Sequence, residues 1–77
     1  MPADVLRYLA ENLVDHPDDV SVTSVDAEGA TVLELRVHPE DMGKVIGKRG
    51  RTAKALRTMV KAAATRDGSA ATVEIVE

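Results

Sequence analysis

The sequence contains no cysteine, no tryptophan and no phenylalanine, and Tyr8 is its only aromatic residue. Without cysteine there are no disulfides or thiolate metal sites, which is typical of a reducing cytosol. Without large aromatic side chains the core must be small, which favours stabilisation by a partner subunit or ligand. No apolar run approaches the roughly 20 residues of a membrane span, and the N-terminus lacks the apolar segment of a signal peptide. We therefore expect a cytoplasmic protein that does not associate with membranes.

Acidic residues are absent from residues 44–66, although the whole chain carries a formal net charge of -3. This stretch holds eight basic residues, whereas the rest of the chain holds two basic residues and all 13 acids. Charges more than about 8–10 Å apart are screened at physiological salt, so an approaching ligand feels a local field. The basic stretch therefore favours binding of a polyanion at one place. A merely solvated helix face is the alternative interpretation.

Hydrophobic periodicity predicts an α+β protein in the order helix, strand, strand, helix, helix, strand. The predicted elements are a helix over 4–15, half-buried strands over 20–26 and 31–38, a short helix over 39–46, a longer helix over 51–66 and a strand over 72–76. The first two strands form a hairpin around a turn at 27–30. We expect three helices on one face of a three-stranded sheet, in a single domain that spans residues 1–77.

The longer predicted helix is amphipathic, with one apolar side and one basic side. The positions predicted to be buried are Ala53, Leu56, Met59, Val60 and Ala63. The opposite side gathers the basic residues Arg51, Lys54, Arg57 and Lys61.

A glycine loop lies at the junction of the last two helices, where Gly47 and Gly50 enclose Lys48 and Arg49. Glycine reaches the backbone conformations of a sharp turn at low cost, and its missing side chain lets another backbone approach. The longer helix begins directly after the loop, so we expect its free N–H groups and positive dipole end to point there. Lys48, Arg49 and Arg51 add full charges. These features favour a sugar-phosphate backbone as the ligand.

Two other phosphate-binding motifs do not fit this loop. A Walker A motif has four residues between its first glycine and its Gly-Lys, and a Ser or Thr follows the lysine. Here Gly43 and Gly47 enclose three residues, and Lys48 is followed by Arg49. A dinucleotide-binding fingerprint follows a strand, whereas this loop follows a predicted helix. Nucleotide hydrolysis and redox chemistry are therefore not expected.

No other residue group predicts a catalytic or metal site. His16 and His38 each precede a proline and have no neighbouring ligands at metal spacing. The acid pairs Asp18-Asp19 and Glu40-Asp41 are best explained as capping and first-turn residues, because no nucleophile accompanies them. We expect a non-catalytic protein without a metal or other cofactor.

The segment VIGKRG, residues 45–50, resembles the GxxG loop of a KH domain, and the element order resembles the bacterial type II arrangement. The segments LVDHPDDV (13–20), VHPEDMGKVIGKRGRTAKALRT (37–58) and VKAAA (60–64) are similar to the small single-KH proteins of the KhpA family. The similarity covers nearly the whole chain. In KH domains this loop clamps the backbone of about four nucleotides of single-stranded RNA or DNA.

The resemblance implies that Gly47, Lys48, Arg49 and Gly50 form the clamp. It also implies an apolar groove for bases, with Ile46, Ala53 and Leu56 near or under it. The remaining basic residues that would attract the nucleic acid are Lys44, Arg51, Lys54 and Arg57. Family members often carry basic residues where this chain has Ser69-Ala70-Ala71, so we expect weaker backbone contacts at that edge.

The resemblance further implies a homodimer, or a heterodimer with a KH-containing partner called KhpB (also Jag or EloR). It implies a post-transcriptional regulator or RNA chaperone that is linked to cell elongation and division. Single-stranded RNA is the expected ligand, and no residue distinguishes it from single-stranded DNA. A protein-interaction module, with the glycine loop as a helix connector and the basic face against an acidic protein, is the alternative.

Overall fold

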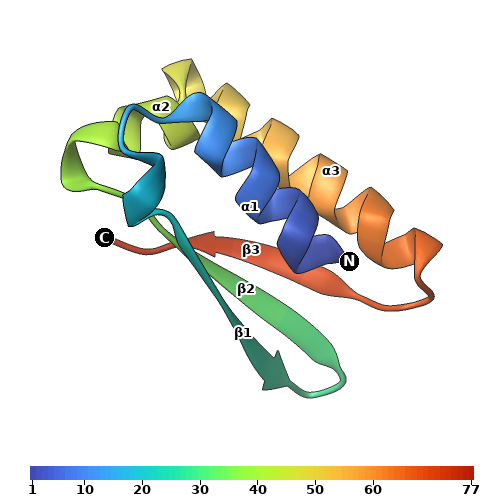
Figure 1. Ribbon diagram of the computed structural model, residues 1–77. Coiled ribbons are helices and arrows are strands. Elements are labelled where there is room, and N and C mark those ends of the chain that lie inside the picture. The colour runs from blue at the N-terminus through green and yellow to red at the C-terminus, as the bar shows by residue number, and fades with distance from the viewer.

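In the computed structural model, which describes residues 1–77, three helices cover one face of a three-stranded sheet (Figure 1). The helices are α1 (Pro2–Leu13), α2 (Met42–Ile46) and α3 (Arg51–Arg66), and the strands are β1 (Ser21–Ala27), β2 (Ala30–Arg36) and β3 (Ala71–Ile75). Short 3₁₀ turns at Pro17–Asp19, Pro39–Asp41 and Lys48–Gly50 precede β1, α2 and α3. The predicted α+β class and element order are confirmed, and α3 has the predicted bounds.

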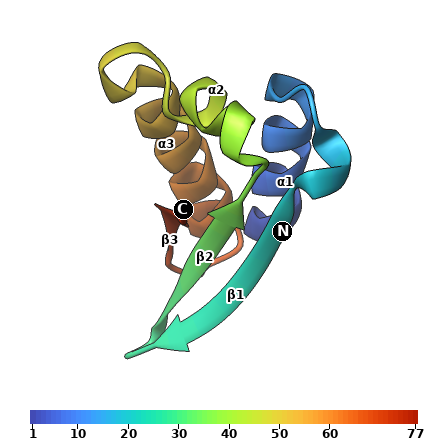
Figure 2. The same cartoon turned by 90° about the vertical axis from the view of Figure 1, so that its left-hand side faces the viewer.

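The sheet has the order β1-β2-β3, with β1 antiparallel and β3 parallel to the central strand β2. A two-residue turn closes the hairpin, and its residues Glu28 and Gly29 both have positive φ, 47° and 84°. Two positive φ values are typical of the type I′ turn that suits the twist of a hairpin. In Figure 2, α1 lies over β1 and α3 lies over β3, with β2 between these strands. The parallel crossover from β2 to β3 carries α2, the glycine loop and α3.

The core is aliphatic, as the composition predicts. Its buried cluster consists of Leu6, Ala10, Leu33, Leu35, Val45, Leu56, Val60 and Val73. Only 11 of 77 residues are buried, so the core is small for a chain of this length. None of the three helices combines the length and the apolarity that a bilayer crossing requires.

Strand β1 is more exposed than the alternation of its residues predicts. Its register pairs Val22 with Leu35 and Ser24 with Leu33, so the helix-facing side of β1 becomes polar after Val22. Val25 pairs with Val32 on the open face of the sheet, and it is 43% exposed. Within β1 only Val22 is partly buried. The prediction of a half-buried strand is therefore wrong for the rest of β1, because the valines change faces along the strand.

Helix α3 buries a narrower stripe than predicted. The buried positions are Ala53, Leu56, Val60 and Ala64, at the spacing of a single helix face. Met59 lies about 100° around the helix from Val60 and is 50% exposed. Its predicted burial is wrong, and Ala63 is only partly buried. This flank of α3 leaves a large apolar side chain in contact with solvent.

Candidate nucleic-acid interface

The glycine loop has an unusual backbone, since Gly47, Arg49 and Gly50 all have positive φ, at 77°, 58° and 73°. Gly47 also has ψ of 172°, a combination that only glycine adopts readily. A Cβ atom at Gly47 would lie 2.6 Å from Thr52 Cβ and 2.8 Å from Thr52 N. A Cβ at Gly50 would meet open space. The space that we expected both glycines to leave for a ligand backbone is filled by Thr52 at Gly47, so only Gly50 offers it.

Backbone N–H groups of the loop are directed by its two short-range hydrogen bonds and by its φ and ψ angles. Gly50 N–H donates to Gly47 O over 3.2 Å. Arg51 N–H, which we expected to be free, donates to Lys48 O. Lys48 has a helical conformation, and Arg49 after it has a left-handed one. This pair of conformations turns successive backbone N–H groups toward one point. Such a nest binds anions, and it lies before Gly50 rather than after it.

Most of the basic side chains around the loop and along α3 have no partner in the chain. The exposed cations that form no ion pair are Lys48, Arg49, Arg51, Lys54, Arg57, Lys61 and Arg66. Lys44 differs, because its Nζ lies 2.8 Å from Asp15 Oδ2. The hydrogen bond and the charge of that carboxylate raise the pKa of Lys44. The charge of Lys44 is thus partly satisfied within the protein, whereas that of its neighbours faces solvent.

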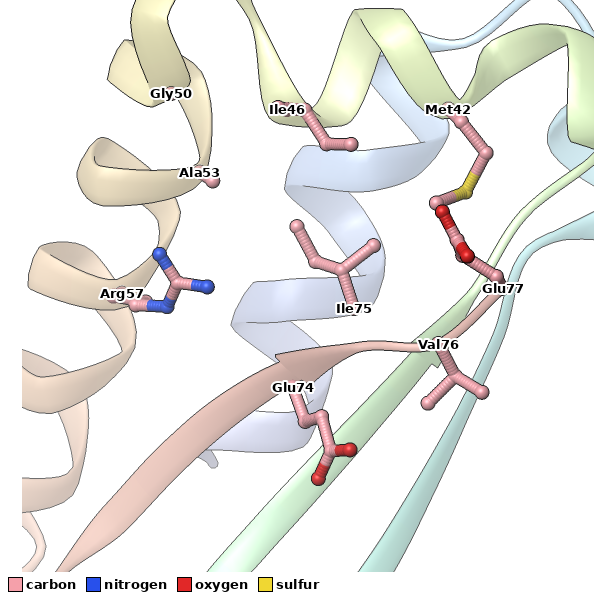
Figure 3. Close-up of a pocket in the computed structure, with 9 residues that line it drawn as sticks. All are labelled: Met42, Ile46, Gly50, Ala53, Arg57, Glu74, Ile75, Val76 and Glu77. Carbon is pink, nitrogen blue, oxygen red and sulfur yellow. The ribbon is translucent and has the colours of Figure 1, made fainter.

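A groove of about 530 Å³ opens beside the loop, between α2, the start of α3 and the end of β3 (Figure 3). It is lined by Met42, Ile46, Gly50, Ala53, Arg57, Glu74, Ile75, Val76 and Glu77. Of the three residues expected near or under the groove, Ile46 and Ala53 line it, whereas Leu56 is buried in the core and does not. Of the predicted basic residues, only Arg57 lines the groove, and in Figure 3 its guanidinium projects from α3 toward Ile75.

One wall of the groove was not predicted from the sequence. That wall is the last stretch of β3 and the residues after it, and it faces α3 because β3 pairs in parallel with β2. Strand pairing of this kind joins distant segments and leaves no local signal. Met42, by contrast, lies four residues before Ile46 on the same helix face, and that spacing was a usable signal.

The family described as KhpA/KhpB, KH domain, matches residues 3–75. This chain belongs to that family. Relatives named RNA-binding protein KhpA include one from Clostridium acetobutylicum, 54% identical over 94% of this chain and 96% of the relative. Another, from Leifsonia xyli, is 51% identical over 100% of this chain and 99% of the relative. One from Streptomyces coelicolor is 55% identical over 80% of this chain and 78% of the relative.

The fold of this KH domain is also found in a solved structure of Era from Aquifex aeolicus, bound to GDP and AlF4⁻. The TM-score is 0.67 at 19% identity, over 96% of this chain. The chain spans 29% of the length of that structure, and the likeness concerns the fold alone.

Outside the groove of the KH domain, His16 and His38 lie together, although the sequence predicts no neighbouring ligand for either. Their rings stack with centroids 4.0 Å apart and 15° between planes. Ligand atoms of His16, His38 and Glu40 all lie within 4.8 Å of one another, so the prediction of isolated histidines is wrong. The parallel planes direct the ring lone pairs side by side rather than toward one point. His38 Nδ1 already accepts from Glu40 N–H over 3.0 Å.

Asp41 lies in the first turn of Pro39–Asp41, as predicted, but its side chain makes no capping hydrogen bond and instead anchors this histidine pair. Its side chain is fully buried and accepts hydrogen bonds from the backbone N–H groups of Asp15 (3.3 Å) and His16 (2.9 Å), and His16 Nδ1 lies 3.0 Å away. Burial raises the pKa of Asp41, but the hydrogen bonds from His16 and Asp15 together outweigh it and lower that pKa. The hydrogen bond to Asp41 in turn raises the pKa of His16. The carboxylate therefore ties the end of α1 to the start of α2, which carries the glycine loop.

Proposed function

We propose that this protein binds single-stranded RNA without catalysis, holding the RNA backbone at its glycine loop. The observation that carries the proposal is the loop itself. The helical and left-handed conformations of Lys48 and Arg49 form a nest of backbone N–H groups, and the unpaired side chains of both residues lie beside a groove with an apolar floor. The names of the KhpA relatives support RNA as the ligand.

In this mechanism a phosphate occupies the nest formed by Lys48 and Arg49, and the two side chains neutralise its charge and that of its neighbour. Bases lie in the groove against Ile46, Ala53 and Ile75, which offer aliphatic contact in place of aromatic stacking. Such a groove takes about four nucleotides, so we expect a single domain to bind weakly. The other cations of α3 raise the local concentration of RNA.

The test replaces Lys48 and Arg49 with Asp and measures binding of a fluorescent single-stranded RNA pool by anisotropy at two salt concentrations. The matched control is Arg7→Asp/Arg36→Asp, which lowers the net charge equally but lies on α1 and β2. We expect the loop variant to lose about tenfold or more in affinity and the control to lose about threefold or less, because unlike the loop pair it removes no direct phosphate contact. Circular dichroism checks that both variants fold.

Wild-type affinity in a folded loop variant contradicts the proposal and favours the protein-interaction module, in which the loop only connects two helices. Equal losses in both variants indicate attraction by overall charge, without a clamp. Competition with DNA of the same sequence then identifies the preferred nucleic acid, since the 2′-hydroxyl is the chemical difference.

We also propose that the domain acts as a homodimer or with a KhpB-type partner in the bacterial cytoplasm, in post-transcriptional control linked to cell elongation and division. The match to the KhpA/KhpB family supports this proposal. Pairing two weak sites raises affinity through effective concentration. Sedimentation of the 8.2 kDa chain, alone and with KhpB, is the measurement. A chain that stays monomeric both alone and in the presence of KhpB contradicts the proposed pairing.

A further inference from the structure

Arg57 is the only cation among the residues that line the groove. In Figure 3 its guanidinium extends from α3 into the space beside Ile75 and below Ile46. No carboxylate pairs with it, whereas Arg36 pairs with Glu34 and Lys44 with Asp15. Its N–H donors therefore face the groove without a partner from the protein.

Two acids of the opposite wall, Glu74 and Glu77, line the groove, and neither forms an ion pair with this guanidinium. Glu74 lines the groove, but successive side chains of β3 alternate, and Val73 is the buried neighbour that faces the helices. Figure 3 shows the Glu74 carboxylate turned away from Arg57. A ligand in the groove thus meets the unneutralised charge and the hydrogen-bonding fork of Arg57.

Arg57 lies too far along α3 to hold the phosphate that the loop holds. It follows Gly50 by seven positions, which corresponds to about 10 Å of helix. In Figure 3 the side chain points toward Ile75, over the apolar floor where the bases lie in the proposed function. Its donors are therefore placed against the edge of a base.

A guanidinium is planar and donates two parallel hydrogen bonds, so it pairs best with an edge that carries two adjacent acceptors. Guanine offers O6 and N7, and cytosine offers O2 and N3. The Watson–Crick and Hoogsteen edges of adenine and the Watson–Crick edge of uracil place an N–H donor beside each acceptor. No edge of either base offers two adjacent ring or exocyclic acceptors, so one arm of the fork is left without an acceptor. We propose that Arg57 reads one base of the bound strand and selects guanine or cytosine there over adenine and uracil. This inference rests on the proposed function of the groove.

The test compares U8 RNA with three octamers that each carry one internal G, C or A, using the wild-type protein. We expect the G or C octamer to bind about fivefold or more tightly than U8 and the A octamer, since a bidentate contact is worth about 1–3 kcal/mol. Arg57→Lys keeps the charge but loses the fork. It should bind U8 within about threefold of wild type and reduce the base preference to below about twofold.

The comparison variant is Lys54→Gln, which removes a charge of the same helix outside the groove lining. It should weaken binding of all four octamers alike and leave the preference intact. Equal wild-type affinity for the four octamers, or an undiminished preference in Arg57→Lys, overturns the inference while the proposed function stands. A wild-type protein that binds none of the octamers overturns both.

Discussion

The two loop glycines serve different physical purposes, so the same substitution should have different costs. Gly47→Ala places a Cβ against Thr52 and demands a backbone conformation near φ 77° and ψ 172°. Gly50→Ala meets no atom and has only the strain of a left-handed residue. We expect a loss of about 1 kcal/mol in unfolding free energy for Gly50→Ala and more than about 2 kcal/mol for Gly47→Ala.

Urea denaturation followed by circular dichroism measures this difference. Equal losses would mean that Thr52 moves aside without cost, and the close contact would then not explain glycine at position 47. Gly50→Ala also separates folding from binding. It should fold but hold RNA less well, because its methyl group enters the side from which a ligand backbone approaches.

The hydrogen bond between Asp41 and His16 makes the stability of the protein depend on pH. The pKa of His16 is raised, so its contribution is full below the unfolded value near 6.5 and is lost as pH rises through the folded value. The pKa of Asp41 is lowered, so its contribution is present above the unfolded value near 4 and is lost as pH falls through the folded value. The pair therefore stabilises the protein most between about pH 4 and 6.5.

His16→Gln should thus lose more stability relative to wild type at pH 5.5 than at pH 8.5. The difference in stability between the two proteins is the relevant quantity, because it cancels the pH-dependent contributions that both share. Urea midpoints at the two pH values give it. A penalty that is the same at both values would show that the ring of His16 contributes by packing against His38 rather than by its charge.

Helix α3 has three sides that differ in burial and charge, and its sequence predicts two of them. One side is buried, a second carries the free cations, and a flank carries the exposed Met59. We expect Leu56→Ala to cost about 2–5 kcal/mol, which is close to the whole stability that so small a core supplies. Met59→Ala should change the unfolding free energy by less than about 0.5 kcal/mol.

Thermal denaturation of the wild type and the two variants at several protein concentrations is the check. A large loss for Met59→Ala that grows with protein concentration would instead place Met59 in a subunit contact, since association makes stability depend on concentration.

The elements that sequence predicts well are those set by local pattern. The bounds of α3 follow from Gly50 before it, the acid-free amphipathic repeat within it and Gly68 beyond it. The contacts that sequence does not predict are set by tertiary packing. Asp41 resembles a first-turn acid until the chain brings residues 15 and 16 onto it. The β3 wall of the groove likewise exists only because β3 pairs with β2.

At the scale of the whole molecule, a protein with a net charge of -3 keeps its unpaired cations on the loop and α3, with the single exception of Arg7 on α1. The acids lie elsewhere, and several are occupied by partners within the chain, as Asp15 is by Lys44. Because screening limits the reach of each charge to about 8–10 Å, the acidic body does not cancel the attraction at the loop. It repels the strand from other faces and so orients its approach.

This separation predicts a salt dependence that follows the contacts rather than the net charge. Binding to about four nucleotides involves about three phosphates, and each contributes about -0.7 to the slope of log affinity against log salt. We expect a slope of about -2 for the wild type and for Arg7→Asp/Arg36→Asp, but a slope nearer to zero for Lys48→Asp/Arg49→Asp. Anisotropy titrations between 50 and 300 mM salt, roughly the range in which such slopes are resolved, provide the measurement. If the slope changes equally in both variants, overall charge governs binding and the loop loses its special role. If it changes only in the loop variant, the phosphates are held at the loop, where the nest and the unpaired side chains of Lys48 and Arg49 meet.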